Sequence, residues 1–442
     1  MQLYEMIALP FYLAVLSLLG LILREWRYRG ADCAVYWMPA LWAHFIGVLA
    51  FDAVYVFYYG GGDTTTYHAG ATIIRQTLTE NSGLGWQLMT MPAGERTLQT
   101  APIIDRIGGY YEAANTLIVM RIAAIAQLFT LGSFWLSSLL FSALSFLGLW
   151  ALFRVMLDLY PRLLRHIALA VLFVPSVIFW GTGIMKDTLS IAFLGFLVYG
   201  VYHLFIKRDQ VILPLLLIPI SLYIVLSTKA YIVVGFAPAV VYWIVAHGLS
   251  SIGQAQLRAL TRFSIAVLVG FVIYWQRNQI WSLGDRVVQQ FVQLAISFQG
   301  WHGFITETLE RSSGYSLGDI EFTPMGILKK MPASVNATLF RPYFYEANSP
   351  VMLLSAAESS ALLLGSLYVW LRAGIWRTWR LIAQDHFAVF CLLFSVLFAF
   401  AVGFASYNFG ALVRYKIPCL PFYIALLFIV WHRHKEDLAL RK

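Results

Sequence analysis

Long apolar segments recur along the whole chain and constrain its fold more than any other feature. About 20 apolar residues in a helix are enough to cross the hydrocarbon core of a bilayer. Hydrophobic residues make up 60% of the 442 residues and charged residues only 12%, which is about half the charged share of a soluble domain. The sequence therefore predicts an all-α, polytopic integral membrane protein.

About eleven segments are expected to span the membrane, judged by their apolar length. They cover residues 6–23, 33–59, 131–153, 167–179, 189–206, 211–226, 231–246, 263–275, 351–371, 387–407 and 417–431. Two longer polar stretches, residues 60–115 and 276–350, are expected to form large loops. The apolar run 116–129 is interrupted by Arg121 and is typical of an interfacial helix with a snorkelling arginine. Since no internal repeat or soluble segment is evident, residues 1–442 are interpreted as one polytopic domain.

Short basic loops follow the odd-numbered segments and indicate one common side of the membrane. Their basic residues are Arg24, Arg27 and Arg29, Arg154, Arg162 and Arg165, Lys207 and Arg208, Arg258 and Arg262, Arg372, Arg377 and Arg380, and Arg433 and Lys435. The positive-inside rule assigns this side to the cytoplasm. The N-terminus is then outside, the C-terminus inside, and both large loops extracytoplasmic. Basic loops beside anionic lipid also explain the net charge of +9 better than a nucleic-acid partner does.

Three consecutive glycines end the second segment and directly precede Asp63. Glycine lets the backbone turn sharply or approach a ligand closely, whereas a helix end needs only one glycine as a cap. Gly60–Gly62 therefore indicate more than a helix cap, and we predict that Asp63 is an outward-facing active-site carboxylate, with Tyr67 and His68 close behind it. The alternative interpretation is a solvated loop in which Asp63 caps the next helix.

Further charged residues fall on the predicted outer face, where the positive-inside rule disfavours lysine and arginine. They are Lys186, Asp187, Lys229, Arg341, Glu346, Glu358, Arg414 and Lys416. Ionisable groups at membrane depth are costly, which favours a functional role for them.

Each charged group also has a purely structural interpretation. Lys186 and Asp187 are neighbours that could pair locally, and Lys229 could snorkel to the interface. Arg341 and Glu346 could pair to pin a loop, and residues 414–416 could anchor a helix at the interface.

The residue types on this face suit one kind of chemistry. Cations bind lipid-linked phosphate or pyrophosphate, and a carboxylate within reach can accept the proton of a sugar hydroxyl. The histidines, including His68 and His302, lack companion ligands at metal spacing. The three cysteines lie in or beside apolar runs without a CxxC pattern. No cofactor is therefore predicted, and a divalent metal requirement is left open.

Four short motifs resemble the integral-membrane glycosyltransferases of the GT-C class and the related Wzy-type polymerases of bacterial surface polysaccharides. They are Gly62-Asp63-x-x-x-Tyr67, Trp180-Gly181-Thr182-Gly183-Ile184-x-Lys186-Asp187, Phe340-Arg341-Pro342-x-x-x-Glu346 ahead of Glu358, and Arg414-Tyr415-Lys416-Ile417-Pro418-x-x-Pro421. The resemblance covers most of the chain but is diffuse.

The resemblance implies a transferase or polymerase in the bacterial inner membrane. Its donor would be a polyprenyl-phosphate- or pyrophosphate-linked sugar and its acceptor a glycan. The catalytic carboxylate of GT-C enzymes corresponds to Asp63, with Glu346 and Glu358 as further candidates. A polymerase would rely on Arg341 and Arg414 to stabilise the departing pyrophosphate.

Two other functional classes remain open. A transporter or flippase of lipid-linked sugars or small molecules would need polar or broken helices in mid-membrane. A non-catalytic scaffold of an envelope assembly would need no converging charge. A nucleotide-driven pump is disfavoured, because no phosphate-binding loop is present in the sequence.

Overall fold

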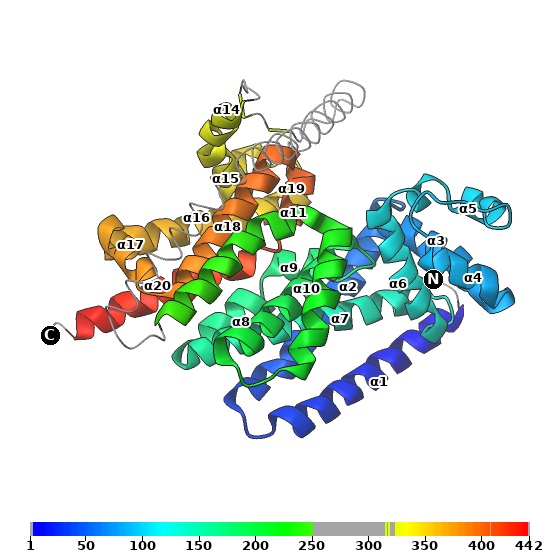
Figure 1. Cartoon of the computed structure of the whole chain (residues 1–442), viewed down its shortest axis with the longest axis horizontal. Helices are drawn as coiled ribbons and strands as arrows, with labels where there is room; N and C mark the ends of the chain where they lie inside the picture. The colour runs from blue at the N-terminus through cyan, green and yellow to red at the C-terminus, as the bar shows by residue number, and fades with distance from the viewer. Residues whose placement is uncertain (1–2, 251–313, 316, 319–322, 407, 441–442) are drawn as a thin grey trace, which may run out of the picture. The chain divides into compact units, whose positions relative to one another are not determined.

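The computed structural model describes residues 3–250, 314, 315, 317, 318, 323–406 and 408–440 (Figure 1). Its regular elements are all helical. Among the described residues, seven helices are long and apolar enough to cross a membrane, or eight if one bent pair counts as a span. The expectation of a helical, multi-pass membrane protein is thus supported, whereas the count of about eleven spans is not confirmed. The chain divides into two compact units, Met1–Val233 and Val234–Lys442.

Long apolar helices form the body of the first unit. They are α1 (Leu3–Tyr28), α2 (Trp37–Ala53) with the π-helical turn Val54–Tyr58, α7 (Phe134–Leu159) and α10 (Lys186–Val201) with the π-helical turn Tyr202–Lys207. α7 and α10 pack face to face through glycines. A Cβ atom added to Gly195 would lie 2.0 Å from the carbonyl oxygen of Gly148. Such close backbone approach is typical of packed membrane helices.

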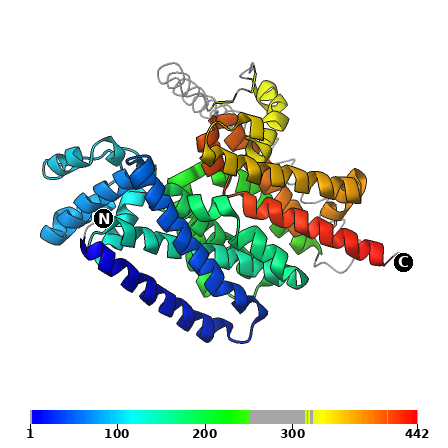
Figure 2. The same ribbon diagram turned by 180° about the vertical axis from the view of Figure 1, so that it is seen from behind.

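The polar stretch 60–115 is helical rather than an irregular loop. It forms α3 (Asp63–Glu80), α4 (Ser82–Thr90) and α5 (Ala101–Ile107), and α3 packs on α6 (Ala114–Phe129). Figures 1 and 2 both show α3, α4 and α5 at the end of the first unit opposite α8 (Leu164–Leu172). Arg121 does not snorkel as expected. Its Nε donates to the Leu88 carbonyl at 2.9 Å and its Nη2 donates to the Met91 carbonyl, so it satisfies carbonyls that the end of α4 leaves open.

One expected span differs from the sequence interpretation for a local backbone reason. The segment 167–179 is divided between α8 (Leu164–Leu172) and α9 (Pro175–Trp180), because Pro175 begins a new helix. The segments 211–226 and 231–246 share the label α11 (Ile212–Ser250), but they are two helices that meet at a kink, as the sequence predicts, and Lys229 is the non-helical residue of that kink. The expected span 263–275 and most of the stretch 276–350 lie outside the described residues.

The second unit contains the end of α11 and the C-terminal helices. These are α14 (Pro324–Lys329), α15 (Met331–Phe340), α16 (Pro350–Ala373), α17 (Ile375–Ala383), α18 (His386–Ser406), α19 (Phe409–Tyr415) and α20 (Leu420–Ala439). Aromatic residues of α18 form much of its core. The ring centroids of Phe390 and Phe394 both lie 5.8 Å from that of Phe236 of α11. α19 and α20 are bent by 66° at their junction.

Candidate functional site

The glycine loop before α3 has the geometry expected from the sequence. Gly60, Gly61 and Gly62 have φ values of 70°, 135° and 145°, which side chains disfavour. Gly62 is the N-cap of α3, and its N–H donates to Thr65 Oγ1 at 3.0 Å. Asp63 is half-buried and is the first helical residue rather than the cap. A carboxylate in the first turn is stabilised by the helix dipole.

Five predicted site residues from three distant segments gather in the first unit. Tyr67 lies one turn after Asp63 and is buried, and the Lys186 ammonium lies 5.9 Å from the centroid of its ring. Asp187, fully buried in the first turn of α10, forms an ion pair with Lys229 at the break in α11. We refer to Asp63, Tyr67, Lys186, Asp187 and Lys229 as the α3–α10–α11 cluster.

This pairing corrects one structural interpretation of the sequence and adds a partner to another. Lys229 is only 6% exposed, so its ammonium stays in the interior and does not snorkel. Asp187 contacts a lysine 42 residues further along the chain and not merely its neighbour Lys186. A second hydrogen bond, 3.0 Å between the hydroxyls of Ser190 and Thr228, joins the same two helices.

His68 links α3 to α6. Its Nδ1 accepts a hydrogen bond of 2.9 Å from Gln127 Nε2, which also donates to the His68 carbonyl at 3.0 Å. Burial lowers the pKa of His68 to about 4, so the imidazole is neutral near pH 7. This contact explains the conformation of His68 without a metal or substrate.

Arg341 and Glu346 form an ion pair in the second unit, at the loop between α15 and α16. Arg341 Nε lies 3.0 Å from Oε1 and 3.1 Å from Oε2 of Glu346, and Oε2 also accepts the Tyr343 N–H at 2.8 Å. The guanidinium lies over two rings, 5.3 Å from the centroid of Tyr315 and 5.0 Å from that of Phe409. Burial alone would lower the pKa of Arg341, but the hydrogen bonds and charge of Glu346 raise it. Both carboxylate oxygens of Glu346 therefore accept hydrogen bonds. This agrees with the structural interpretation, in which Arg341 and Glu346 pair to hold the loop in place.

A completely buried lysine lies next to this loop. Lys416, at the bend between α19 and α20, is 0% exposed. Its Nζ donates to Ser359 Oγ at 2.8 Å, and that hydroxyl donates to the Arg341 carbonyl at 3.0 Å. Glu358 precedes Ser359 on α16 and acts on Lys416 through its charge. No ion-pair partner within 4.0 Å of Lys416 exists in the described part of the chain. Arg341, Glu346, Glu358, Ser359 and Lys416 form what we call the α16 cluster.

The predicted carboxylates are therefore distributed over both units, with Asp63 in the first and Glu346 and Glu358 in the second. Arg414 lies near the α19–α20 bend, 5.8 Å from the ring centroid of its neighbour Tyr415. Sequence reasoning missed Ser359, although it follows Glu358 directly. Across the residues that the structure describes, no group of three or more histidine, cysteine and acidic side chains is arranged to hold a metal ion.

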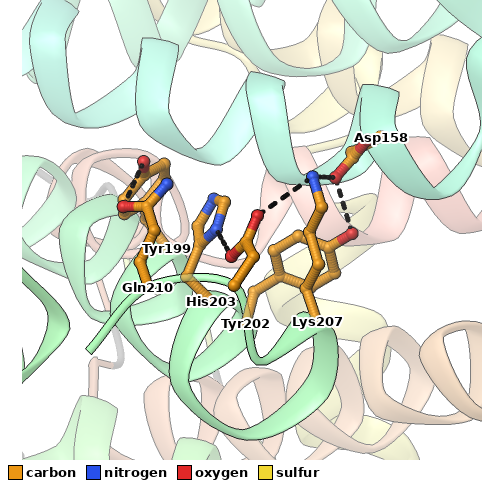
Figure 3. Close-up of polar contacts among 7 residues, drawn as sticks. Asp158, Tyr199, Tyr202, His203, Lys207 and Gln210 are labelled. Atoms are coloured by element: carbon orange, nitrogen blue, oxygen red, sulfur yellow. Dashed lines mark hydrogen bonds and ion pairs between the residues drawn. The ribbon is translucent and has the colours of Figure 1, made fainter.

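Figure 3 shows a further polar network in the first unit, which the sequence did not predict. Lys207 Nζ lies 2.7 Å from Asp158 Oδ2 and 3.3 Å from Asp209 Oδ2. Tyr202 donates to the same Asp158 oxygen at 2.7 Å, and His203 Nδ1 lies 2.5 Å from Asp209 Oδ1. The network ties the end of α7 to the π-helical turn after α10.

The π-helical turn explains why sequence patterns did not reveal this network. Its backbone period differs from that of an α-helix, so the usual spacing of three or four residues does not show which side chains share a face. The sequence interpretation used Lys207 only as evidence for membrane orientation. The structure adds that Lys207 holds the ends of two long helices together.

Comparison with protein-family models, with curated proteins and with solved structures found no match to this chain.

Proposed function

We propose that this chain is a membrane glycosyltransferase. It would take a sugar from a polyprenyl-phosphate- or pyrophosphate-linked donor and transfer it to a glycan acceptor during assembly of a bacterial surface polysaccharide. The reaction would occur at the extracytoplasmic face of the inner membrane, where the sequence predicts that the charged motifs lie.

The buried ammonium of Lys416 is the observation that carries this proposal. A buried charge is stable only when it is paired or well hydrogen-bonded, yet its hydrogen bond in the described residues goes to the neutral Ser359 hydroxyl. Glu358 acts on Lys416 only through its charge, and a phosphate oxygen would supply an anionic partner that accepts a hydrogen bond directly. The Arg341 carbonyl accepts from the same hydroxyl, so a second cationic residue is anchored beside Lys416. Arginine favours phosphate through its planar set of donors.

The chemistry requires a proton acceptor as well as cations. The acceptor hydroxyl would attack the anomeric carbon, a new C–O bond would form, and the bond to the lipid phosphate would break. A carboxylate would take the hydroxyl proton, and Lys416 and Arg341 would stabilise the charge on the departing phosphate. Glu346 is engaged with Arg341 and suits a positioning role, which leaves Glu358 as the candidate base within the α16 cluster, and Asp63 stays the candidate base that the sequence predicts.

The proposal is tested with purified protein in lipid nanodiscs, a polyprenyl-linked sugar donor and mass analysis of donor and acceptor. Lys416→Met removes an incompletely paired buried charge, so it should preserve or raise thermal stability. It should also weaken donor use roughly tenfold or more, as loss of a charged hydrogen bond does. Lys329→Met, at an exposed position of α14, is the matched control and should change neither property.

Two results would reject this assignment. If wild-type protein leaves every plausible donor chemically unchanged, the chain is not a transferase. If Lys416→Met unfolds the protein, Lys416 is a structural residue and the phosphate role is wrong.

A transporter of lipid-linked sugars is the second candidate, and one observation favours it. The buried pair of Lys229 and Asp187 lies at the kink between the two helices of α11, and transporters place charged groups at broken helices in mid-membrane. A transporter would move the donor across a proteoliposome membrane without changing it chemically, so the same mass analysis distinguishes the two functions.

A further inference from the structure

A basic cavity of about 370 Å³ lies between α17 and α20 in the second unit. Three arginines, Arg377, Arg380 and Arg433, line it together with Gln384 and the acidic residues Glu436 and Asp437. The proposed glycosyl-transfer function does not use this cavity. Glu358 lies roughly 22 Å of helix before the end of α16, at 1.5 Å per residue, and α17 begins beyond that end.

The cavity retains hydrogen-bond donors that the protein itself does not use. Arg377 Nη2 pairs with Asp437, and Arg433 Nη2 lies 2.6 Å from Asp385 Oδ2. Arg377 Nε is buried and has no hydrogen-bond partner among the described residues. Arg380 forms no ion pair with any residue that the structure describes. Unused guanidinium donors around a cavity suit a phosphate group, whose oxygens accept several charge-assisted hydrogen bonds.

The same helix has an exposed apolar face. Trp376 is 87% exposed, Ile375 59% and Trp379 51%, whereas Leu381 and Ile382 in the last turn are buried. An amphipathic helix that exposes tryptophans beside arginines is typical of a segment lying in the membrane interface.

The turn between α16 and α17 is consistent with an interfacial position of α17. Gly374 has a φ of 79° and ends the spanning helix α16, so α17 starts as a separate helix after this turn. The positive-inside rule assigns this end of α16 to the cytoplasmic side, where anionic lipid headgroups attract basic segments.

We propose that the cavity binds the phosphodiester headgroup of an anionic glycerophospholipid. Arg380, Arg377 and Arg433 contact the phosphate oxygens, and the acyl chains lie along Trp376 and Trp379. The apolar face distinguishes this ligand from a free phosphate, because it adds a surface for hydrocarbon on the same helix that lines the cavity. The bound lipid holds α17 against α20.

The test uses the full-length protein purified in detergent, with lipids of short acyl chains. Dihexanoyl phosphatidylglycerol, dihexanoyl phosphatidylcholine and inorganic phosphate are titrated while thermal unfolding and lipid retention in native mass spectrometry are measured. Phosphatidylglycerol should raise the unfolding temperature and remain bound at least tenfold more tightly than phosphatidylcholine. Its affinity should decrease as salt concentration rises.

Variants identify the site. Arg380→Gln removes a cation without breaking a described ion pair and should weaken phosphatidylglycerol binding roughly tenfold. Arg372→Gln, whose guanidinium lies over the Tyr368 ring rather than in the cavity, is the control and should leave binding unchanged. Trp376→Ala should reduce the preference for lipid over inorganic phosphate.

Each alternative result overturns the proposal. Equal binding of phosphatidylcholine would exclude selection for an anionic headgroup. Equal stabilisation by inorganic phosphate would make the cavity a soluble-anion site. Unchanged binding in Arg380→Gln with normal unfolding would place the lipid elsewhere. A failure of glycosyl transfer leaves this proposal unaffected, because the assay measures lipid binding alone.

Discussion

Lys229 and Asp187 form a buried ion pair that joins the non-helical residue in α11 to the first turn of α10. The two side chains are 5% and 0% exposed. Removing one partner of a buried pair leaves an uncompensated charge, whereas replacing both with apolar residues is often tolerated. The pair therefore explains why α11 can break at Lys229 and remain packed on α10.

We expect Lys229→Met and Asp187→Leu each to destabilise the protein by about 3–5 kcal/mol, while the double variant recovers much of this loss. Thermal unfolding in detergent measures the three variants as a double-mutant cycle. Additive losses would show that the pair is not coupled. A stable double variant that lacks transfer or transport would assign the pair to function.

Gly62→Val should impair function through backbone geometry. A Cβ atom at Gly62 would lie 2.8 Å from Tyr55 Cε1, and its φ of 145° is unfavourable for a β-branched residue. Gly60→Ala is the comparison, because no atom lies within 4 Å of the added Cβ although φ is also positive. We expect Gly62→Val to lose more donor turnover and more thermal stability than Gly60→Ala. Equal losses of donor turnover and thermal stability in the two variants would show that the Tyr55 contact has no role.

The two candidate bases can be separated by isosteric substitution. Asp63→Asn and Glu358→Gln retain size and most hydrogen bonds but cannot accept a proton. The variant that removes the base should lower the rate of sugar transfer about 10²–10⁴-fold while donor binding persists. Mass analysis of the product and a donor-binding assay check both properties. Wild-type rates in both variants would exclude general-base catalysis by either residue.

His68 should make the protein acid-sensitive. Its pKa in the folded state is about 4, below the ordinary value of 6.5, so the unfolded state binds more protons between these values. Stability should therefore fall as pH decreases from about 6.5 towards 4. His68→Gln should lose less thermal stability than the wild type between pH 7 and pH 5. An identical pH dependence in both proteins would contradict the burial of a neutral imidazole.

Gly195→Val should disrupt packing of α7 on α10. The added Cβ would lie 2.0 Å from the Gly148 carbonyl oxygen, which belongs to the facing backbone and cannot rotate away. Overpacking of this kind costs about 1–3 kcal/mol or more. Gly109→Ala is the control, since its added Cβ meets no atom within 4 Å. Detergent-solubilised yield and unfolding temperature should fall only for Gly195→Val.

Apolar length was sufficient to predict the helical, multi-pass character of the chain. A bilayer requires long apolar helices wherever they pack, so this property depends on local composition alone. The glycine turn before Asp63 was predictable for a similar reason, since its positive φ values depend on the residue type. Membrane orientation stays a prediction from the positions of the basic loops.

Tertiary structure decided which charged residues meet. Local spacing suggested only that Asp187 pairs with Lys186, and the fold brings it to Lys229 as well. The fold also places Ser359 between Lys416 and the Arg341 carbonyl. These partners are far apart in sequence, and no helical or strand period relates them. Burial then determines their properties, because the energy of a charge depends on the atoms that surround it in the folded protein.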